Sequence, residues 1–167
     1  SGDTTNIVGT LQNNGAAVGG VMKPDFEEYL GSTQNVTDNT DTKLEFDTEV
    51  FDTDGCYDNS TNYRFTPTTA GKYFCYLLTQ ANGGSASSIN TARSYIYKNG
   101  SSLKRNLISF QNYPGEVATL IITTTINFNG TSDYIEAYGR IDNTSGTASF
   151  HSPELRSTFG AYKLIGV

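Results

Sequence analysis

Tryptophan is absent from this 167-residue chain, and histidine and methionine each occur once. There is no run of 18 apolar residues, so no segment could span a bilayer as a hydrophobic helix, and we expect no membrane insertion. The two cysteines, Cys56 and Cys75, are too few for a disulfide framework. Their spacing leaves open whether they pair or remain separate thiols, because a bridge needs a specific geometry. The first residues lack the charged and apolar segments of a signal peptide.

Sequence signals of catalysis are also scarce. A hydrolytic triad would need the single histidine, His151, beside a nucleophile and an acid. No nucleophile elbow surrounds any serine, and the spacings of nucleotide-binding loops and zinc sites are missing. We therefore expect His151 to be a surface or loop histidine, and we expect neither enzymatic activity nor a cofactor.

Acidic residues outnumber basic ones, 17 to 11, which gives a formal net charge of −6. The imbalance lies in residues 1–75, which hold twelve Asp and Glu against four Lys and Arg. Nucleic-acid binding rests on clustered Lys and Arg that neutralise phosphates. The composition therefore argues against nucleic acid as a partner. The simplest explanation of the acidity is that the net charge keeps the protein soluble.

The residues that are abundant indicate an all-β protein. Thr, Tyr and Phe suit the pleated surface of a sheet, whereas Asn, Ser and Gly suit turns. Asn99-Gly100 is a strong hairpin signal, because both residues tolerate a positive φ. The spacing of short strands suits a sandwich or a barrel. The predicted strands are Phe26–Leu30, Val36–Thr37, Lys43–Phe46, Tyr63–Phe65, Lys72–Thr79, Ala92–Lys98, Leu103–Phe110, Val117–Phe128, Tyr134–Ile141, Ala148–His151 and Thr158–Ile165.

Two of these segments carry more specific expectations. Pro67 and Gly71 separate the strand that contains Phe65 from an apolar strand that begins near Tyr73, so the stretch predicts two antiparallel strands in a hairpin. The most hydrophobic segment is Val117–Phe128, and its β-branched residues favour a strand over a helix. Its three consecutive apolar residues, Leu120 to Ile122, predict burial on both faces near the middle.

Residues 1–23 differ from the rest of the chain. Glycines are scattered among Asn and Ala, and the short apolar pairs could not form a core of their own. We expect an extended arm or linker that packs against something else, with Pro24 marking its end. The predicted organisation is therefore an N-terminal arm, 1–23, and a head domain, 24–167.

An acidic stretch offers the best candidates for a metal site. Loop carboxylates supply the oxygen ligands that Ca²⁺ prefers, and Asp52, Asp54 and Asp58 lie close together in the sequence. The stretch departs from the EF-hand pattern, because Cys56 occupies the fifth position and the glycine is misplaced. A solvated acidic turn is the alternative to a calcium site.

Several motifs in order resemble the globular-head family of complement C1q, within the wider tumour-necrosis-factor-like jelly rolls. The strongest match is Phe65-Thr66-Pro67 followed by Ala70-Gly71-Lys72-Tyr73-Phe74. The others are Phe26-Glu27-Glu28-Tyr29-Leu30, Lys43-Leu44-Glu45-Phe46-Asp47, Glu49-Val50-Phe51-Asp52, Tyr97-Lys98-Asn99-Gly100 and Phe159-Gly160-Ala161-Tyr162-Lys163-Leu164. The matches cover about residues 24 to 167, and another Thr-rich β-sandwich is the alternative.

The resemblance implies a ten-strand jelly-roll sandwich that forms a tight homotrimer. Its opening and closing strands are expected side by side near the threefold axis, and aromatic residues are expected in the trimer interface and the core. The matching residues for this packing are Phe26, Tyr29, Phe65, Tyr73, Phe74, Phe159 and Tyr162.

The residues in these motifs are more similar to versions of the domain found in bacteriophage structural proteins. Animal members usually follow a collagen stalk, and no collagen-like Gly-x-y repeat is visible here. This resemblance implies a virion protein, a trimeric knob on a fibre, appendage or capsid surface. Its N-terminal arm would contact other virion proteins and its head would bind a host surface, with glycan as the expected ligand. A secreted complement-like or cytokine-like module and a carbohydrate-binding module are the alternatives. Five Asn-x-Ser/Thr sequons, beginning at Asn35, Asn59, Asn99, Asn129 and Asn143, are weak support for secretion, because the composition produces such matches.

Overall fold

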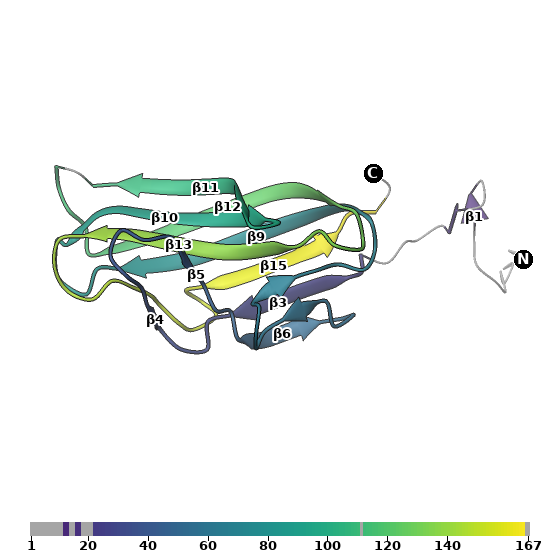
Figure 1. Cartoon of the computed structure of the whole chain (residues 1–167), viewed down its shortest axis with the longest axis horizontal. Helices are drawn as coiled ribbons and strands as arrows, with labels where there is room; N and C mark the ends of the chain where they lie inside the picture. The colour runs from purple at the N-terminus through teal and green to yellow at the C-terminus, as the bar shows by residue number, and fades with distance from the viewer. Residues whose placement is uncertain (1–11, 14–15, 18–21, 111, 166–167) are drawn as a thin grey trace, which may run out of the picture.

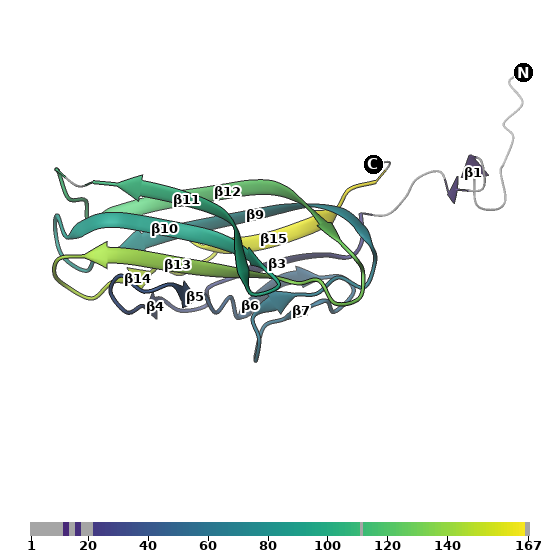
Figure 2. The same ribbon diagram turned by 45° about the horizontal axis from the view of Figure 1, so that its top comes forward.

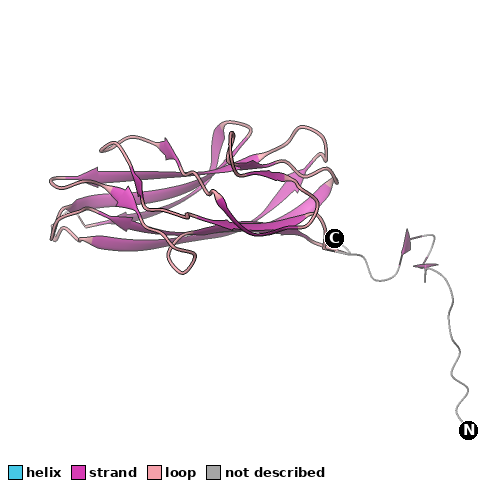
Figure 3. Ribbon diagram, turned by 90° about the horizontal axis from the view of Figure 1, so that it is seen from below, coloured by secondary structure: helices cyan, strands magenta, loops and turns pink. Residues whose placement is uncertain are grey.

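The computed structural model describes residues 12–13, 16–17, 22–110 and 112–165, and every regular element in them is a strand. Two antiparallel sheets lie face to face along the long axis of the head, as Figures 1 and 2 show. Loops connect the strands at both ends of this sandwich (Figure 3). Among the described residues no helix is long and apolar enough to cross a membrane. The predicted all-β class is confirmed.

One sheet, which we call the β10 sheet, has the strand order β11-β10-β13-β8-β7, and β5 also pairs with β13. The Asn99-Gly100 turn joins its first two strands, with φ values of 52° and 76°, so the predicted hairpin is confirmed. Its strands are β5 (Thr42–Lys43), β7 (Tyr57–Asp58), β8 (Arg64–Phe65), β10 (Ile89–Lys98), β11 (Ser101–Ser109) and β13 (Ile135–Asn143).

The other sheet, which we call the β9 sheet, has the order β4-β14-β9-β15-β3-β6, and β12 pairs with β9 along its whole length. Outside the sandwich, β1 (Gln12–Asn13) pairs with β2 (Ala16–Ala17). The strands of the β9 sheet are β3 (Asp25–Tyr29), β4 (Gln34–Asn35), β6 (Thr48–Asp52), β9 (Gly71–Asn82), β12 (Val117–Phe128), β14 (Ser149–Phe150) and β15 (Thr158–Lys163).

The first and last strands of the head are hydrogen-bonded neighbours. Asp25 of β3 lies opposite Tyr162 of β15, and the pairing runs to Tyr29 opposite Thr158. This adjacency and the two-sheet sandwich confirm the predicted jelly roll. The predicted arm, 1–23, lies mostly outside the described residues, so its role and boundary stay predictions.

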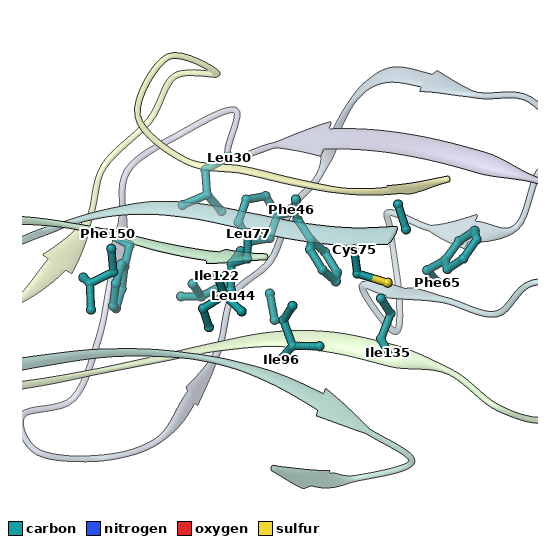
Figure 4. Close-up of a cluster of buried hydrophobic side chains, with 14 of the residues drawn as sticks. Leu30, Leu44, Phe46, Phe65, Cys75, Leu77, Ile96, Ile122, Ile135 and Phe150 are labelled. Atoms are coloured by element: carbon teal, nitrogen blue, oxygen red, sulfur yellow. The ribbon is translucent and has the colours of Figure 1, made fainter. Parts of the chain in front are cut away.

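Aromatic side chains fill one end of the core between the sheets. Phe26 stacks on Phe65 and Tyr57, with ring centroids 4.5 and 4.7 Å apart, and meets Phe159 edge-on at 5.2 Å. Tyr73 is also fully buried. Aliphatic residues such as Leu44, Leu77, Ile96 and Ile122 fill the middle of the sandwich (Figure 4). Such dense aromatic contacts stabilise the core through area burial and ring geometry together.

The predicted hairpin between Phe65 and Tyr73 is wrong. The strand β8, which contains Phe65, pairs with β7 and β13 in the β10 sheet, whereas β9 belongs to the opposite sheet. The segment around Pro67 therefore crosses from one sheet to the other. The side chains of Phe65 and Tyr73 meet inside the core, with ring centroids 5.8 Å apart, instead of lying side by side on one sheet.

The strand β12 has the predicted bounds, but it is not buried on both faces. Its burial alternates strictly around the middle, so that Leu120 and Ile122 face the core while Ile121 is 59% exposed. The two cysteines are both buried and both free, which answers the open question about their pairing. Burial raises the pKa of the Cys75 thiol.

Candidate functional site: an apolar outer sheet face

The outer face of the β9 sheet carries large apolar side chains where a solvated sheet face would be polar. Strand β9 runs through this face between β12 and β15. Every second residue of its middle part, Tyr73, Cys75 and Leu77, points into the core. The residues between them, Phe74, Tyr76 and Leu78, therefore point outward, and each stays partly exposed. Both faces of β9 are thus apolar.

Neighbouring strands extend this surface sideways. Pairing places Tyr162 of β15 beside Phe74, and their ring centroids are 5.4 Å apart. Ile121 of β12 lies opposite Leu78, and on the other side Thr158 separates Leu78 from Tyr29 of β3. We call this outward-facing set the association face; its members are Tyr29, Phe74, Tyr76, Leu78, Ile121 and Tyr162.

A glycine at the centre of the association face makes room for a tyrosine. A Cβ added to Gly160 would lie only 2.3 Å from both Cζ and Oη of Tyr76, so the tyrosine ring lies directly across the glycine backbone. From this position the Tyr76 hydroxyl donates a hydrogen bond to the Glu27 carboxylate. Burial, followed by this hydrogen bond, raises the pKa of Tyr76. The ring and the carboxylate therefore hold one fixed arrangement in the middle of the face.

Replacing Gly160 by alanine should change the association face without unfolding the head. The new methyl group would displace the Tyr76 ring, and overpacking of this kind costs about 1–3 kcal/mol. If the face is an interface, we expect its dissociation constant to rise about tenfold or more. Analytical ultracentrifugation would measure the association, and circular dichroism would check the fold. Unchanged association with a folded variant would show that the Tyr76 position does not matter.

The face is bordered by polar residues on one side and by an acidic edge strand on the other. Outward positions of β12 other than Ile121 include Thr119, Thr123 and Thr125, which are exposed. On the opposite edge, Phe51 of β6 lies beside Glu27 and is 37% exposed. An apolar centre with a polar border is the usual anatomy of a protein–protein interface.

The residues predicted from the family resemblance separate into two groups. Four of them are fully buried core residues: Phe26, Phe65, Tyr73 and Phe159. The other three, Tyr29, Phe74 and Tyr162, lie on the association face. Tyr76, Leu78 and Ile121 were missed. Their signal was present in the sequence, because apolar residues at consecutive positions of a strand must leave one set facing outward.

A buried carboxyl group lies beneath the edge of the same sheet. Glu28 is 1% exposed, and neither of its oxygens has a hydrogen-bond partner among the described residues. The Tyr57 hydroxyl is likewise buried and without a partner in this part of the chain. Burial first, and then the negative charge of Glu49, raises the pKa of Glu28 to about 8. The folded state therefore favours the protonated carboxyl group at neutral pH, a property that no pattern in the sequence indicated.

The three calcium candidates do not converge in space as ligands. Asp52 accepts hydrogen bonds from the backbone N–H groups of Cys56 and Tyr57, at 3.0 and 2.8 Å. Asp58 accepts hydrogen bonds from three backbone N–H groups in residues 60–62, and the Thr61 bond is the main reason that its pKa is lowered. Within the described residues there is no group of three or more acidic, Cys or His side chains that could hold a metal. The geometry favours the alternative, acidic side chains that stabilise turns.

His151 lies just after β14 and is half-buried. Its Nδ1 atom is 3.3 Å from Nη1 of Arg156. Partial burial, followed by the Arg156 charge, lowers its pKa. A cationic neighbour does not orient a histidine as a general base, for which a carboxylate or a backbone acceptor is needed. The described hydrogen bonds of His151 therefore give no support to a catalytic role.

Comparisons with known proteins agree with the architecture. No family model and no curated protein matches the sequence. Among solved structures, the globular domain of a zebrafish complement 1qA protein matches with a TM-score of 0.60 at 11% identity, covering 85% of this chain and 98% of that one. Murine APRIL matches with a TM-score of 0.62 at 12% identity, covering 84% and 98%. The tumour-necrosis-factor protein Eiger from S. frugiperda matches with a TM-score of 0.60 at 12% identity, covering 87% and 96%.

Identities this low show a shared fold and nothing more. The head therefore has the jelly-roll fold of C1q and tumour-necrosis-factor domains, and the matches span nearly the whole of each of these domains. Function has to be argued from the surfaces of this chain.

Proposed function

We propose that the chain is the non-enzymatic head of a homotrimeric virion attachment protein, on a phage fibre, appendage or capsid surface. The observation that carries the proposal is the association face. A set of aromatic and aliphatic side chains lies outward over β3, β15, β9 and β12, on strands buried on their other side. Contiguous apolar surface of this kind marks a site of protein–protein contact.

The position of the face fits a threefold assembly of identical chains. The closing strand, β15, crosses the face between β9 and β3, and the opening strand, β3, forms one side of it. The family resemblance implies that these two strands lie near a threefold axis. Removing apolar surface from water is worth about 25 cal/mol per Å². A trimer would bury this surface three times over, against the cost of bringing the chains together.

Two observations support an attachment role over a catalytic one: the described residues form no recognisable catalytic site, and the N-terminal arm has the composition of a linker. The described part of the chain contains no metal-ligand cluster, and His151 lacks the partners of a general base. The Gly- and Asn-rich arm, 1–23, has the composition of a connection to a larger assembly. A head domain carried on such an arm is suited to binding a host surface.

Three of the sequon amides disfavour the alternative of a glycosylated secreted module. Nδ2 of Asn99 donates to Asp133, Nδ2 of Asn129 donates to Ser132, and Nδ2 of Asn143 donates to backbone oxygens including that of Gly83. Each amide nitrogen therefore serves a turn within the fold. A sugar attached there would replace one of the two amide hydrogens and would have to fit beside these partners, inside turns that the amide holds in place.

The proposal is tested by mass and by location. Multi-angle light scattering of the full chain at micromolar concentration should give the mass of three 18.1-kDa chains. Labelled trimer should bind to host cells and compete with intact particles for adsorption. Gold-labelled antibodies against the chain should decorate native particles in electron micrographs. A single-chain mass, or particles without label, would contradict the corresponding part of the proposal.

A further inference from the structure

The outer face of the β10 sheet, on the opposite side of the sandwich, carries a cluster of arginines. Arg93 of β10 lies directly opposite Arg140 of β13, and Arg105 of β11 lies opposite Tyr95, two residues along β10 from Arg93 and on the same face. All three alternate with inward-facing residues such as Ala92 and Ile141, so they share the outer face. We call these three residues the arginine cluster.

This arrangement is unfavourable in the protein alone. Like charges directly opposite each other on neighbouring strands destabilise a sheet. The Nε atom of Arg93 is buried and has no hydrogen-bond partner among the described residues, and leaving a buried donor unpaired carries a further penalty. The Arg93 side chain as a whole stays partly exposed, so a negatively charged group that bound its guanidinium would offset the repulsion between the arginines.

Among the described residues, carboxylates of the chain pair with one member of the cluster, Arg140, and leave the other two unpaired. The ion pairs in the described part of the chain involve Lys43, Lys98 and Arg140, and not Arg93 or Arg105. Asp41 lies 3.6 Å from Arg140, and Asn39 accepts two hydrogen bonds from the same guanidinium group. Arg140 is therefore held in place by Asp41 and Asn39. Arg93 and Arg105 form no ion pair within the described residues and are available to bind an anionic ligand.

Aromatic side chains lie next to the cluster on the same face. Tyr138, two residues before Arg140, stacks on Tyr97 with ring centroids 4.1 Å apart and planes 19° apart. Both rings are partly exposed. The Tyr97 hydroxyl donates a hydrogen bond to Asp41, at 3.1 Å, so this pair would contact the carbon skeleton of a sugar mainly through its apolar ring surface. Arginine binds a carboxylate with two parallel hydrogen bonds.

We propose that the arginine cluster and the Tyr97–Tyr138 pair form a binding site for a saccharide unit that carries one carboxylate. The carboxylate would bind Arg93, supported by Arg105 and Arg140, and the sugar would lie over the tyrosines. A single acidic sugar suits the site better than a long polyanion, because the chain as a whole has a net charge of −6 and repels extended negative charge. This inference specifies the class of ligand that the proposed attachment protein would bind, and it therefore rests on the proposed function.

The location of the site is compatible with a trimer. The association face covers the outer side of the β9 sheet, whereas the arginine cluster lies on the outer side of the β10 sheet, and the core separates them. Three copies of the site would therefore stay open on the outside of the assembly. Such multiplicity raises the avidity for a surface without any new contact.

The test is a titration of the full chain, followed by nuclear magnetic resonance or calorimetry, with paired probes. Trigalacturonic acid, a glucuronic-acid disaccharide and sialyllactose would each be compared with its methyl ester, in which every carboxylate has lost its charge and gained a methyl group. We expect at least one acid to bind and its ester to bind about tenfold more weakly or not at all. If none of the acids binds at 10 mM, or if an ester binds as well as its acid, the proposal is overturned.

Variants locate the binding and separate it from stability. Arg93→Gln should weaken the acid about tenfold or more, because a charge-assisted pair is lost, and it should leave thermal stability equal or higher. Lys104→Gln is the matched control, since Lys104 is exposed on β11, the strand that contains Arg105, but pairs with Ile96, whose side chain faces the core. Equal losses in both variants would overturn the proposal. Inorganic sulfate that competes as tightly as the acid sugar would also overturn it, by showing an anion site without saccharide selectivity.

The outcome is independent of assembly. The monomeric variant Phe74→Arg should keep the affinity per chain of the unmodified protein, because Phe74 lies on the opposite sheet. If the unmodified protein is a single chain in solution and still binds the acid, the proposed assembly alone is contradicted. If the unmodified protein is a trimer and binds none of the acids, the saccharide site alone is contradicted.

Discussion

Replacing Phe74 by arginine should convert the proposed trimer into single 18.1-kDa chains. Phe74 lies between Tyr162 and Tyr76 on the association face, with ring centroids 5.4 and 6.4 Å away. In a trimer the new guanidinium group would be buried against apolar neighbours without a counter-charge, which costs several kcal/mol for each chain. Light scattering during gel filtration at micromolar concentration is the direct measurement.

The control for this variant places the same charge elsewhere. Leu155 is 90% exposed in the loop before β15, so Leu155→Arg should leave the mass unchanged. Circular dichroism of Phe74→Arg should show an intact β-fold, because Phe74 points away from the core. A folded Phe74→Arg variant that keeps the trimer mass at nanomolar concentration would refute the assignment of this face.

Stability should fall as the pH rises from about 5 to about 8, and Glu28 should account for much of the fall. Its folded pKa of about 8 lies above the value of 4.5 that it has when exposed, so the folded state holds a proton that the unfolded state releases. Folding is therefore favoured at low pH and loses free energy until the pH passes the folded pKa. One pKa unit corresponds to about 1.4 kcal/mol, and we expect a loss of roughly 2–4 kcal/mol.

The variant Glu28→Gln isolates this contribution. Glutamine keeps the shape but has no proton to lose, so the variant should gain stability over the unmodified protein steadily between pH 5 and pH 8. Urea unfolding at several pH values measures the difference. Glu45→Gln, at an exposed position, serves as the control with little change. A difference between Glu28→Gln and the unmodified protein that is constant with pH would show that Glu28 does not titrate in this range.

The parts of the fold that depend on local sequence pattern could be predicted. The bounds of Val117–Phe128 and the turn at Asn99-Gly100 follow from β-branched residues and from tolerance of a positive φ. The edge strand β6, Thr48–Asp52, was not predicted, because acidic residues interrupt any alternation there. Pattern alone also could not show that Phe65 and Tyr73 belong to opposite sheets, since a crossing segment and a hairpin loop have similar turn residues.

The candidate sites were predicted less completely than the fold. Apolar residues on both faces of β9 could be read from the sequence, but which set faces out depends on where the second sheet lies. The opposition of Arg93 and Arg140 joins residues 47 positions apart and depends on the register of β10 with β13. Glu28 looked like an ordinary strand residue, because its burial is produced by the sheet packing around it and leaves no trace in its neighbours.

The pairing of β3 with β15 also determines how the head would bear a mechanical load. Asp25, at the start of β3, lies opposite Tyr162, near the end of β15, and β3 is flanked on its other side by β6. If the arm is the anchor and ligands pull on the rest of the head, tension enters along β3. The hydrogen bonds to both neighbours lie perpendicular to this strand and are loaded together in shear. Pulling the two ends of the chain apart would instead open the β3–β15 ladder one bond at a time, so we expect the head to resist force from its ligand far better than force between its termini.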